Sequence, residues 1–396
     1  KGIRLKGASA ATTIIQTGGF KLILQTSSAN SRVRVDSMTI RKSSGTSWDI
    51  QITGTAQNWR LNDLIMDNNN VNGGYQIRIG DGTENTDAFT YGLIDNNSFI
   101  NRDFSTSIFI EWPRGASELI ASGDYIWSLA AQRGTAQAVY IEANTFSDKA
   151  GAAASQTVDC RFGCKYVLRY NTIHNPWIST HSGCTNSGRD PVWVEIYKNT
   201  LTDDTTRYGG SQLEMRSVSG VFWENDFAVT ANKYVISIDH ERSWRTDCSG
   251  TYGPKADGTR VWDENTGGNA AWRAFGQPGW GPIQNNDMND GYVFQGLFAF
   301  DNRDGGVLEN LLIANTGEGP APNNQTTHMV FGRELFNEAD LVAPIGPIAS
   351  RPSTCDPGPA GRDVYISNDE NSQGAKIYIC SATNTWTAHW EPYTYP

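Results

Sequence analysis

The chain has 396 residues and a formal net charge of −10, and charged residues make up 19% of it. This acidic balance argues against a nucleic-acid partner, which requires a basic surface, and no run of 18 apolar residues is available to span a membrane. The 40 glycines, together with abundant Asn, Asp, Ser and Thr, are typical of a turn-rich β protein.

The first strand-like segment is the opening Lys1-Gly2-Ile3-Arg4-Leu5. It carries no signal peptide, so we expect the numbering to begin after processing or at a truncated edge. Weak copies of a later repeat follow at Val35-Asp36-Ser37-Met38 and at Trp59-Arg60-Leu61-Asn62-Asp63-Leu64.

Further along, a six-residue pattern recurs: an apolar residue, two variable residues, Asn, a small or polar residue, and an apolar residue. Its copies begin at Ile94, Ile141, Leu168, Ile196 and Phe222 and contain Asn97, Asn144, Asn171, Asn199 and Asn225. The last four asparagines are 27, 28 and 26 residues apart. A period of this size indicates a solenoid, in which each unit buries its apolar face only against the next.

Two solenoids share such a core. A leucine-rich repeat requires Leu at most apolar positions and a helix or tight turn on the convex side. Here the apolar positions mix Ile, Leu and Phe, and the intervening segments are polar without helical periodicity. We therefore predict an all-β fold, a right-handed single-stranded parallel β-helix, with a small C-terminal β module.

Alignment on the Asn predicts the packing. The residues three before it and two after it should point inward, while the Asn occupies a bend and bonds to the next Asn of the stack. The residues two before it should point outward, so that Glu142 and Arg169 face each other on adjacent strands.

Long segments without this rhythm interrupt the repeat. We assign residues 1–342 to the β-helix, with long loops at 102–138 and 243–293, residues 343–354 to a Pro-rich linker, and residues 355–396 to the module. Long insertions in a compact fold are usually functional loops.

Six cysteines in a Thr- and Asn-rich chain favour an oxidising compartment. We predict a Cys355–Cys380 disulfide, since so short a module needs a covalent staple, which contributes about 3 kcal/mol. The pairing of Cys160, Cys164, Cys184 and Cys248 is left open. Zinc is a weak alternative for Cys160 and Cys164, because their spacing lacks a second cysteine pair.

Several motifs resemble secreted right-handed parallel β-helix repeat proteins of the pectate-lyase-like superfamily, including uncharacterised bacterial members. They are Arg169-Tyr170-Asn171-Thr172-Ile173, Thr180-His181-Ser182-Gly183 and Glu195-Ile196-Tyr197-Lys198-Asn199-Thr200, with the opening Lys1–Ala8 and the ending Glu391–Pro396. The resemblance implies the fold and a polysaccharide partner. No calcium–aspartate set of pectate lyases and no aspartate set of polygalacturonases is matched.

Acidic residues recur beside arginines along the chain. Asp159 precedes Arg161 by two residues and Glu214 precedes Arg216 by two, while Asp239, His240 and Arg242 form the densest polar cluster. Alternation puts the acid and the Arg of each pair on one strand face, and stacking brings aligned residues within about 5 Å. The stripe is either a solvated salt-bridge ladder or a glycan-binding groove.

For the groove, we predict catalytic roles for Asp239, His240, Arg242, Glu214 and His181, and substrate binding by Arg161, Arg189 and Arg216. A hydrolase requires two carboxylates about 5–10 Å apart, whereas a lyase requires a base near the sugar C–H and a cation on the uronate. Four tryptophans could stack on sugar rings or pack the loop onto the wall: Trp244, Trp262, Trp272 and Trp280.

No cofactor is clearly indicated. Ca²⁺ is a weak candidate at Asn286–Gly291 and Asp301–Gly305, neither of which matches a complete calcium loop. We predict an extracellular or cell-surface protein that binds or cleaves a polysaccharide as a lyase or glycoside hydrolase. The competing hypothesis is a non-catalytic surface, appendage or fibre protein that self-associates end to end through exposed strand edges.

Overall fold

The computed structural model describes most of the chain. The described residues are 2–18, 22–26, 32–45, 48–54, 57–80, 90–111, 133–149, 155–161, 164–180, 193–204, 211–216, 218–228, 234–239, 296–313, 331–332, 335–341, 345–357 and 362–394. They form strands with two short 3₁₀ turns, η6 (Glu338–Asp340) and η7 (Ile348–Ser350). The prediction of an all-β chain is thus confirmed.

An 18-stranded sheet, called here the large sheet, is built almost entirely of parallel strands in two ladders. The first ladder contains β1 (Gly2–Lys6), β4 (Arg32–Lys42), β6 (Asn58–Asp67), β8 (Gly92–Asp95), β11 (Val139–Glu142), β14 (Lys165–Arg169), β17 (Trp193–Tyr197), β20 (Ser219–Trp223), β23 (Leu297–Phe300) and β27 (Leu335–Asn337). The second ladder contains β2 (Ile14–Thr17), β9 (Ser98–Arg102), β12 (Thr145–Asp148), β15 (Thr172–His174), β18 (Thr200–Thr202), β21 (Asp226–Ala228) and β24 (Arg303–Asp304), and the long strands β4 and β6 run through both ladders. The exception is β25 (Val307–Leu308), which pairs antiparallel with β24.

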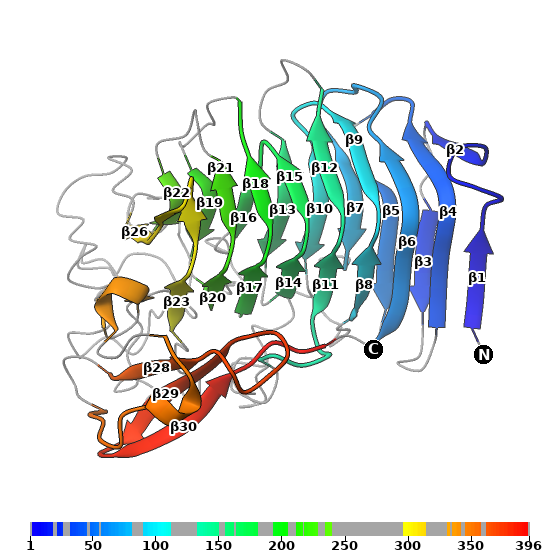
Figure 1. Ribbon diagram of the computed structural model, residues 1–396. Coiled ribbons are helices and arrows are strands. Elements are labelled where there is room, and N and C mark those ends of the chain that lie inside the picture. The colour runs from blue at the N-terminus through cyan, green and yellow to red at the C-terminus, as the bar shows by residue number, and fades with distance from the viewer. Residues whose placement is uncertain are drawn as a thin grey trace, which may run out of the picture.

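A nine-stranded parallel sheet forms another face (Figure 1). It contains β3 (Leu22–Thr26), β5 (Trp48–Gly54), β7 (Tyr75–Ile79), β10 (Thr106–Glu111), β13 (Gln156–Arg161), β16 (Ile178–Thr180), β19 (Ser211–Arg216), β22 (Tyr234–Asp239) and β26 (Leu311–Ile313). Successive passes of the chain therefore lie side by side, as in β14, β15 and β16 beside β17, β18 and β19. This arrangement is consistent with a parallel β-helix.

One strand crosses a segment that the sequence analysis assigned to a loop. The strand β10 lies inside residues 102–138 and pairs with both β7 and β13. Its three consecutive apolar residues are buried, and Ile108 and Ile110 belong to the core. A short apolar run can thus form a strand of this sheet without the Asn repeat.

Residues three before each repeat Asn form one inward column. All five are fully buried: Ile94, Ile141, Leu168, Ile196 and Phe222. The residues two after it form a second buried column, in which the Phe99 and Phe146 rings stack with centroids 4.5 Å apart. Both predicted core columns are confirmed.

The repeat asparagines form a continuous buried ladder. Each Nδ2 donates to Oδ1 of the next Asn, as from Asn144 to Asn171 (3.1 Å) and from Asn171 to Asn199 (2.9 Å). The same Oδ1 accepts the backbone N–H of the preceding Asn, and Nδ2 also donates to a carbonyl of the preceding first-ladder strand, as from Asn171 to Ile141. The ladder starts at Asn97 and ends at Asn302. The six-residue pattern did not predict Asn302 as a member.

The bend itself lies one residue earlier than predicted. Left-handed backbone angles occur at the residue before each ladder Asn, for example at Tyr170 (φ 60°) and Lys198 (φ 55°), and not at the Asn. The Asn side chain stabilises the bend from the adjacent position, because its amide bonds to backbone groups that the bend leaves without backbone partners.

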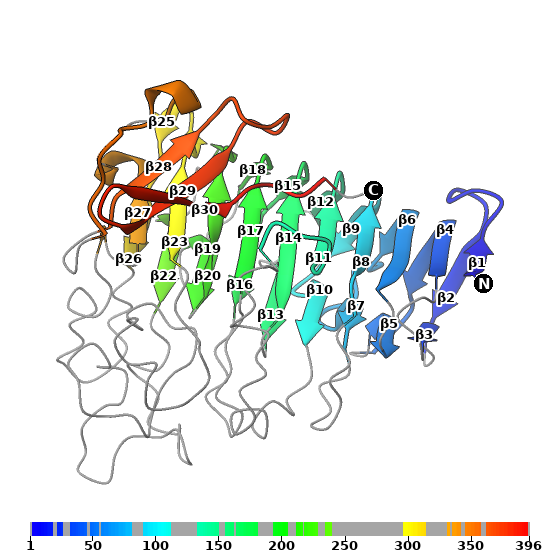
Figure 2. The ribbon, with the colours of Figure 1, turned by 90° about the horizontal axis from the view of Figure 1, so that it is seen from below.

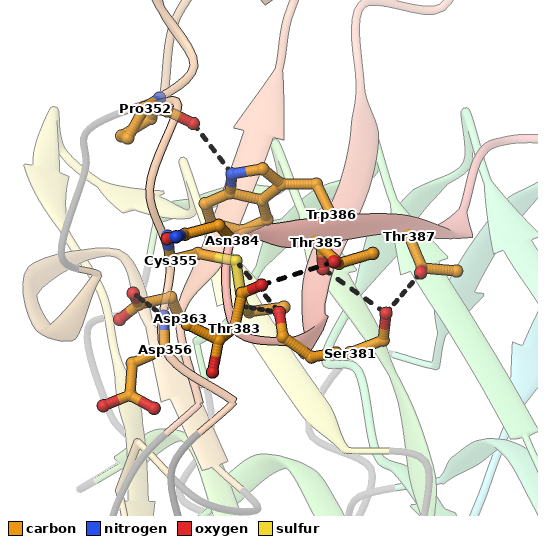
Figure 3. The surroundings of a disulfide bond; sticks show 12 residues. Pro352, Cys355, Asp356, Asp363, Ser381, Thr383, Asn384, Thr385, Trp386 and Thr387 are labelled. Atoms are coloured by element: carbon orange, nitrogen blue, oxygen red, sulfur yellow. Dashed lines mark hydrogen bonds between the residues drawn. A yellow bond between two sulfur atoms is a disulfide. The ribbon is translucent and has the colours of Figure 1, made fainter.

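The C-terminal module is a three-stranded antiparallel sheet of β28 (Val364–Ser367), β29 (Lys376–Ala382) and β30 (Thr385–Trp390). The predicted Cys355–Cys380 disulfide is present, with Cα atoms 5.8 Å apart (Figure 3). The module packs on the outer side of the first ladder (Figure 2), where the Trp390 ring lies 6.0 Å from Tyr197 and 6.2 Å from Trp223.

We expect Asn171→Ala to lower the free energy of unfolding by about 3 kcal/mol, because it leaves the buried N–H and Nδ2 of Asn144 without their acceptor. Urea titration of the purified variant measures the change. Asn72→Ala, at an exposed position outside the ladder, is the matched control and should stay within about 0.5 kcal/mol of the parent. Equal stability of the two variants would contradict a structural ladder.

Candidate functional site

The candidate site is the outer face of the nine-stranded sheet. Along its strands, core residues such as Ile108, Val158 and Leu213 alternate with polar residues on the other side. The register aligns one outward residue from each of the seven strands between β5 and β22 into a row: Gln51, Arg78, Phe109, Asp159, Ser179, Glu214 and Ser237.

The predicted acid–arginine pairs lie on this face, though not on the strand that leads into the Asn bend, which belongs to the large sheet. Within β13, Arg161 Nη2 lies 3.7 Å from Asp159 Oδ2, and Asp159 is almost fully buried. On the adjacent strand, Glu111 is in register with Arg161 and accepts a 2.5 Å bond from Arg78. Opposite charges therefore alternate between neighbouring strands, as the salt-bridge interpretation expects.

Aromatic rings lie beside these charges. The rings of Trp48 and Tyr75 have centroids 5.6 Å apart, and Tyr75 lies 5.3 Å from Phe109. The Arg78 guanidinium is 4.2 Å from the Trp48 ring centre, and Arg161 is 5.3 Å from Phe109. The sequence analysis missed this group because these strands lack a strong Asn repeat. The alternation of Trp48, Ile50 and Ile52 indicates a strand, but by itself it would assign Trp48 to the core face.

Glu214 is a half-exposed carboxylate of this face. It lies on β19, between the positions of Ser179 on β16 and Ser237 on β22. Its Oε2 accepts a 3.1 Å hydrogen bond from the Trp177 indole. This bond fixes the rotamer of the carboxylate.

The strand β22 brings a second predicted acid close to Glu214. Arg216 and Asp239 are in register on β19 and β22, and Ser237 is in register with Glu214. Asp239 is two residues beyond Ser237, so its Cα lies about 8 Å from that of Glu214, given strand spacing and rise per residue. Four of the predicted site residues thus share this sheet: Arg161, Glu214, Arg216 and Asp239.

The other predicted site residues lie outside the described part of the chain, and their roles stay predictions. They are His181, Arg189, His240, Arg242, Trp244, Trp262, Trp272 and Trp280.

A different titratable cluster lies beneath the C-terminal module. The buried Glu195 carboxylate accepts bonds from the Gly134 amide (3.0 Å) and the Trp193 indole (2.9 Å), and burial raises its pKa. Burial lowers the pKa of the neighbouring Lys165 to about 7, although the Glu195 charge opposes this. Trp390 of the module is among the groups that act on the Glu195 carboxylate, so the cluster belongs to the contact between module and sheet and not to the candidate site.

The residues predicted to point outward from the first ladder also contact the C-terminal segment. Arg169 Nε donates to Glu142 Oε2 at 2.6 Å, which confirms that the two residues face each other. Arg169 Nη1 also reaches the Tyr393 carbonyl at 2.5 Å. His389, for which the sequence offered no neighbours, lies against Arg133 and Trp193.

Metal sites find no support in the described ranges. No group of three or more His, Cys, Asp or Glu side chains in that part of the chain could hold a metal ion. At the predicted calcium segment 301–305, Asp301 pairs with Arg303 at 2.8 Å and Asn302 belongs to the buried ladder. The segment Asn286–Gly291 lies outside the described residues. Cys160 and Cys164 form a disulfide, which excludes the zinc alternative for them.

Comparison with protein-family models, with curated proteins and with solved structures found no match. Among the described residues, no helix has the length and apolar character needed to cross a membrane. Two disulfides in the described residues are typical of an oxidising compartment.

We expect the free energy of unfolding to rise between pH 7 and 9, because the unfolded chain protonates Lys165 (pKa about 10.4) where the folded protein does not. The slope contributed is at most about 1.4 kcal/mol per pH unit. Lys165→Met should flatten it, whereas Lys149→Met, at an exposed lysine, should not. Urea titrations at pH 7, 8 and 9 give the slopes, and unchanged slopes in Lys165→Met would contradict the prediction.

Proposed function

We propose that this protein is a secreted right-handed parallel β-helix, similar to pectate-lyase-like proteins, that binds and cleaves an extracellular polysaccharide on the outer face of the nine-stranded sheet. The parallel ladders, the Asn stack and the one-to-one register of successive passes support the fold. The two disulfides support an extracellular or cell-surface location.

The observation that carries the proposal is the register of β19 and β22. It puts Glu214 and Asp239 at neighbouring positions of one sheet, with arginines at 161 and 216. Two carboxyl groups about 6.5–9.5 Å apart leave room for a water molecule between base and sugar, which is the geometry of an inverting hydrolase. The Cα spacing of about 8 Å is compatible with that range.

The chemistry divides between the two acids. Glu214, whose carboxylate accepts the Trp177 indole N–H, acts as the base and removes a proton from the water that attacks the anomeric carbon. Asp239 acts as the acid and donates a proton to the glycosidic oxygen as that bond breaks. Arginines on the same face bind hydroxyl or carboxylate groups of the chain, and the rings of Trp48 and Tyr75 offer apolar surface to the sugar. A lyase would instead use His240 or Arg242.

We expect Glu214→Gln and Asp239→Asn each to lower the rate of polysaccharide cleavage at least about 100-fold, because each removes one proton-transfer group. A panel of neutral and uronic polysaccharides is incubated with the protein, and reducing ends and the ultraviolet absorbance of unsaturated products are followed. Reducing ends without unsaturated products identify hydrolysis.

Glu224→Gln and Asp226→Asn are the matched controls, because both side chains are exposed at the bend between the two ladders of the large sheet. They should retain full activity. If the unmodified protein cleaves no glycan of the panel, or if the site variants cleave as fast as the controls, the hydrolase proposal fails.

A second candidate function is assembly into fibres. Among the described residues, the strand β1 pairs with β4 alone, and its Ile3 (73% exposed) and Leu5 (40% exposed) continue the inward column of Val33 and Val35. An open strand edge with exposed apolar side chains pairs readily with another chain. A non-catalytic surface or appendage protein could assemble through this edge.

If the edge drives assembly, sedimentation velocity should show oligomers that grow with protein concentration, and Ile3→Glu should return the protein to monomers. Val307→Glu, at an equally exposed position (67%) on the β24–β25 hairpin, should leave the oligomers intact. A monomer at every concentration would rule this function out.

A further inference from the structure

The C-terminal module contains a pocket that is separate from the outer face of the nine-stranded sheet. It has a volume of about 330 Å³ and lies beside the Cys355–Cys380 disulfide. Figure 3 shows the surrounding side chains, which come from the segment 352–356, from the start of β28 and from the β29–β30 turn. Ligand pockets usually range from about 300 to 1,000 Å³, so this one suits a single small ring.

The walls of the pocket are held rigidly. The Trp386 indole donates to the Pro352 carbonyl at 2.8 Å, and its ring lies 6.4 Å from Tyr365. The Asp363 N–H donates to the Asp356 carbonyl at 3.0 Å, and the Asp363 Oδ2 accepts the Asp356 N–H at 2.8 Å. A site whose walls are already ordered loses little entropy when it binds a ligand.

Asn384 completes the rim. Its Oδ1 accepts the Cys355 N–H at 3.1 Å, while its own N–H donates to the Cys355 carbonyl at 2.8 Å. With Oδ1 engaged in this way, the amide presents its Nδ2 as a hydrogen-bond donor. The pocket therefore combines an amide donor, the carboxylate acceptors of Asp356 and Asp363, the Trp386 indole ring and the buried Val364.

These groups determine the class of ligand. Carboxylates accept and an amide donates, so together they match hydroxyl groups, which do both. An indole face packs against the C–H groups of a pyranose ring. The described residues that line the pocket include two acids and no base, which disfavours an anionic ligand such as a uronic acid.

We propose that the C-terminal module is a carbohydrate-binding module whose pocket holds one neutral sugar residue against Trp386. The pocket lies on the module, and the proposed acids lie on β19 and β22 of the nine-stranded sheet. The module would therefore bind glycan whether or not the sheet cleaves it, and the two proposals can fail independently.

The test is a titration of the whole 396-residue chain with methyl glycosides of neutral hexoses, with methyl glucuronide and glucosamine as charged probes. Binding is followed by the indole N–H signals in nitrogen–proton correlation spectra, and Trp386→Phe identifies the Trp386 signal. We expect a saturable shift of that signal with at least one neutral glycoside and a weaker or absent shift with methyl glucuronide.

Asp356→Asn and Asp363→Asn keep the size of the side chain but remove a carboxylate acceptor, so each should weaken binding at least fivefold. Ser381→Ala is the control, because Ser381 is an exposed residue of the module outside the pocket, and it should not change the affinity. Asp356→Asn alters an exposed side chain, so it tests the pocket even if other variants misfold. No saturable shift, tighter binding of a charged probe, or equal affinity of the aspartate variants would overturn the proposal.

Glu214→Gln and Asp239→Asn should leave the shift unchanged. Conversely, Asp363→Asn should still cleave soluble oligosaccharides if the parent does. If a variant loses cleavage but keeps the Trp386 shift, the result bears on the proposed hydrolase site of the nine-stranded sheet and leaves the binding pocket of the module supported.

Discussion

The stacking of buried asparagine side chains is the constraint on which the rest of this structure depends. Each bend between the two ladders of the large sheet leaves backbone groups unpaired in an apolar interior, and only a side chain with both a donor and an acceptor can satisfy them from one position. The asparagine side chains of the stack from Asn97 to Asn302 provide both groups at successive bends. Their stacking thereby fixes which residues of successive passes lie side by side.

This constraint acts only at the bend, so it leaves the length of the rest of each pass free. Neighbouring ladder residues are 26 residues apart at Asn199 and Asn225 and 77 apart at Asn225 and Asn302. Insertions can therefore enlarge one pass without disturbing the register of the strands. Chemistry can then vary on the outer faces while the buried columns remain constant.

The two large outer faces have different environments. On the first ladder, Arg169, Tyr197 and Trp223 are covered by the C-terminal segment, and burial shifts the pKa of Glu195 and Lys165. On the nine-stranded sheet, arginines, carboxylates and aromatic rings alternate between strands instead. Covered charges stabilise an intramolecular contact, whereas half-buried ones such as Glu214 and Arg161 can meet a ligand.

The sequence by itself determined the all-β class, the two inward columns, the ladder from Asn97 to Asn225, the Cys355–Cys380 pair and the Glu142–Arg169 contact. The columns, the ladder and the Glu142–Arg169 contact follow from spacing, because a repeating strand pattern can bury its apolar residues only by stacking in register. The disulfide follows instead from the small size of the C-terminal module. Asn302 was missed because Asp304 occupies the next apolar position of the pattern. Only the tertiary structure decided the left-handed residue of each bend, the Cys160–Cys164 pairing and the cover over the first ladder. The cover depends on partners such as Arg169 and Tyr393, which are 224 residues apart, and no local period records a contact of that range.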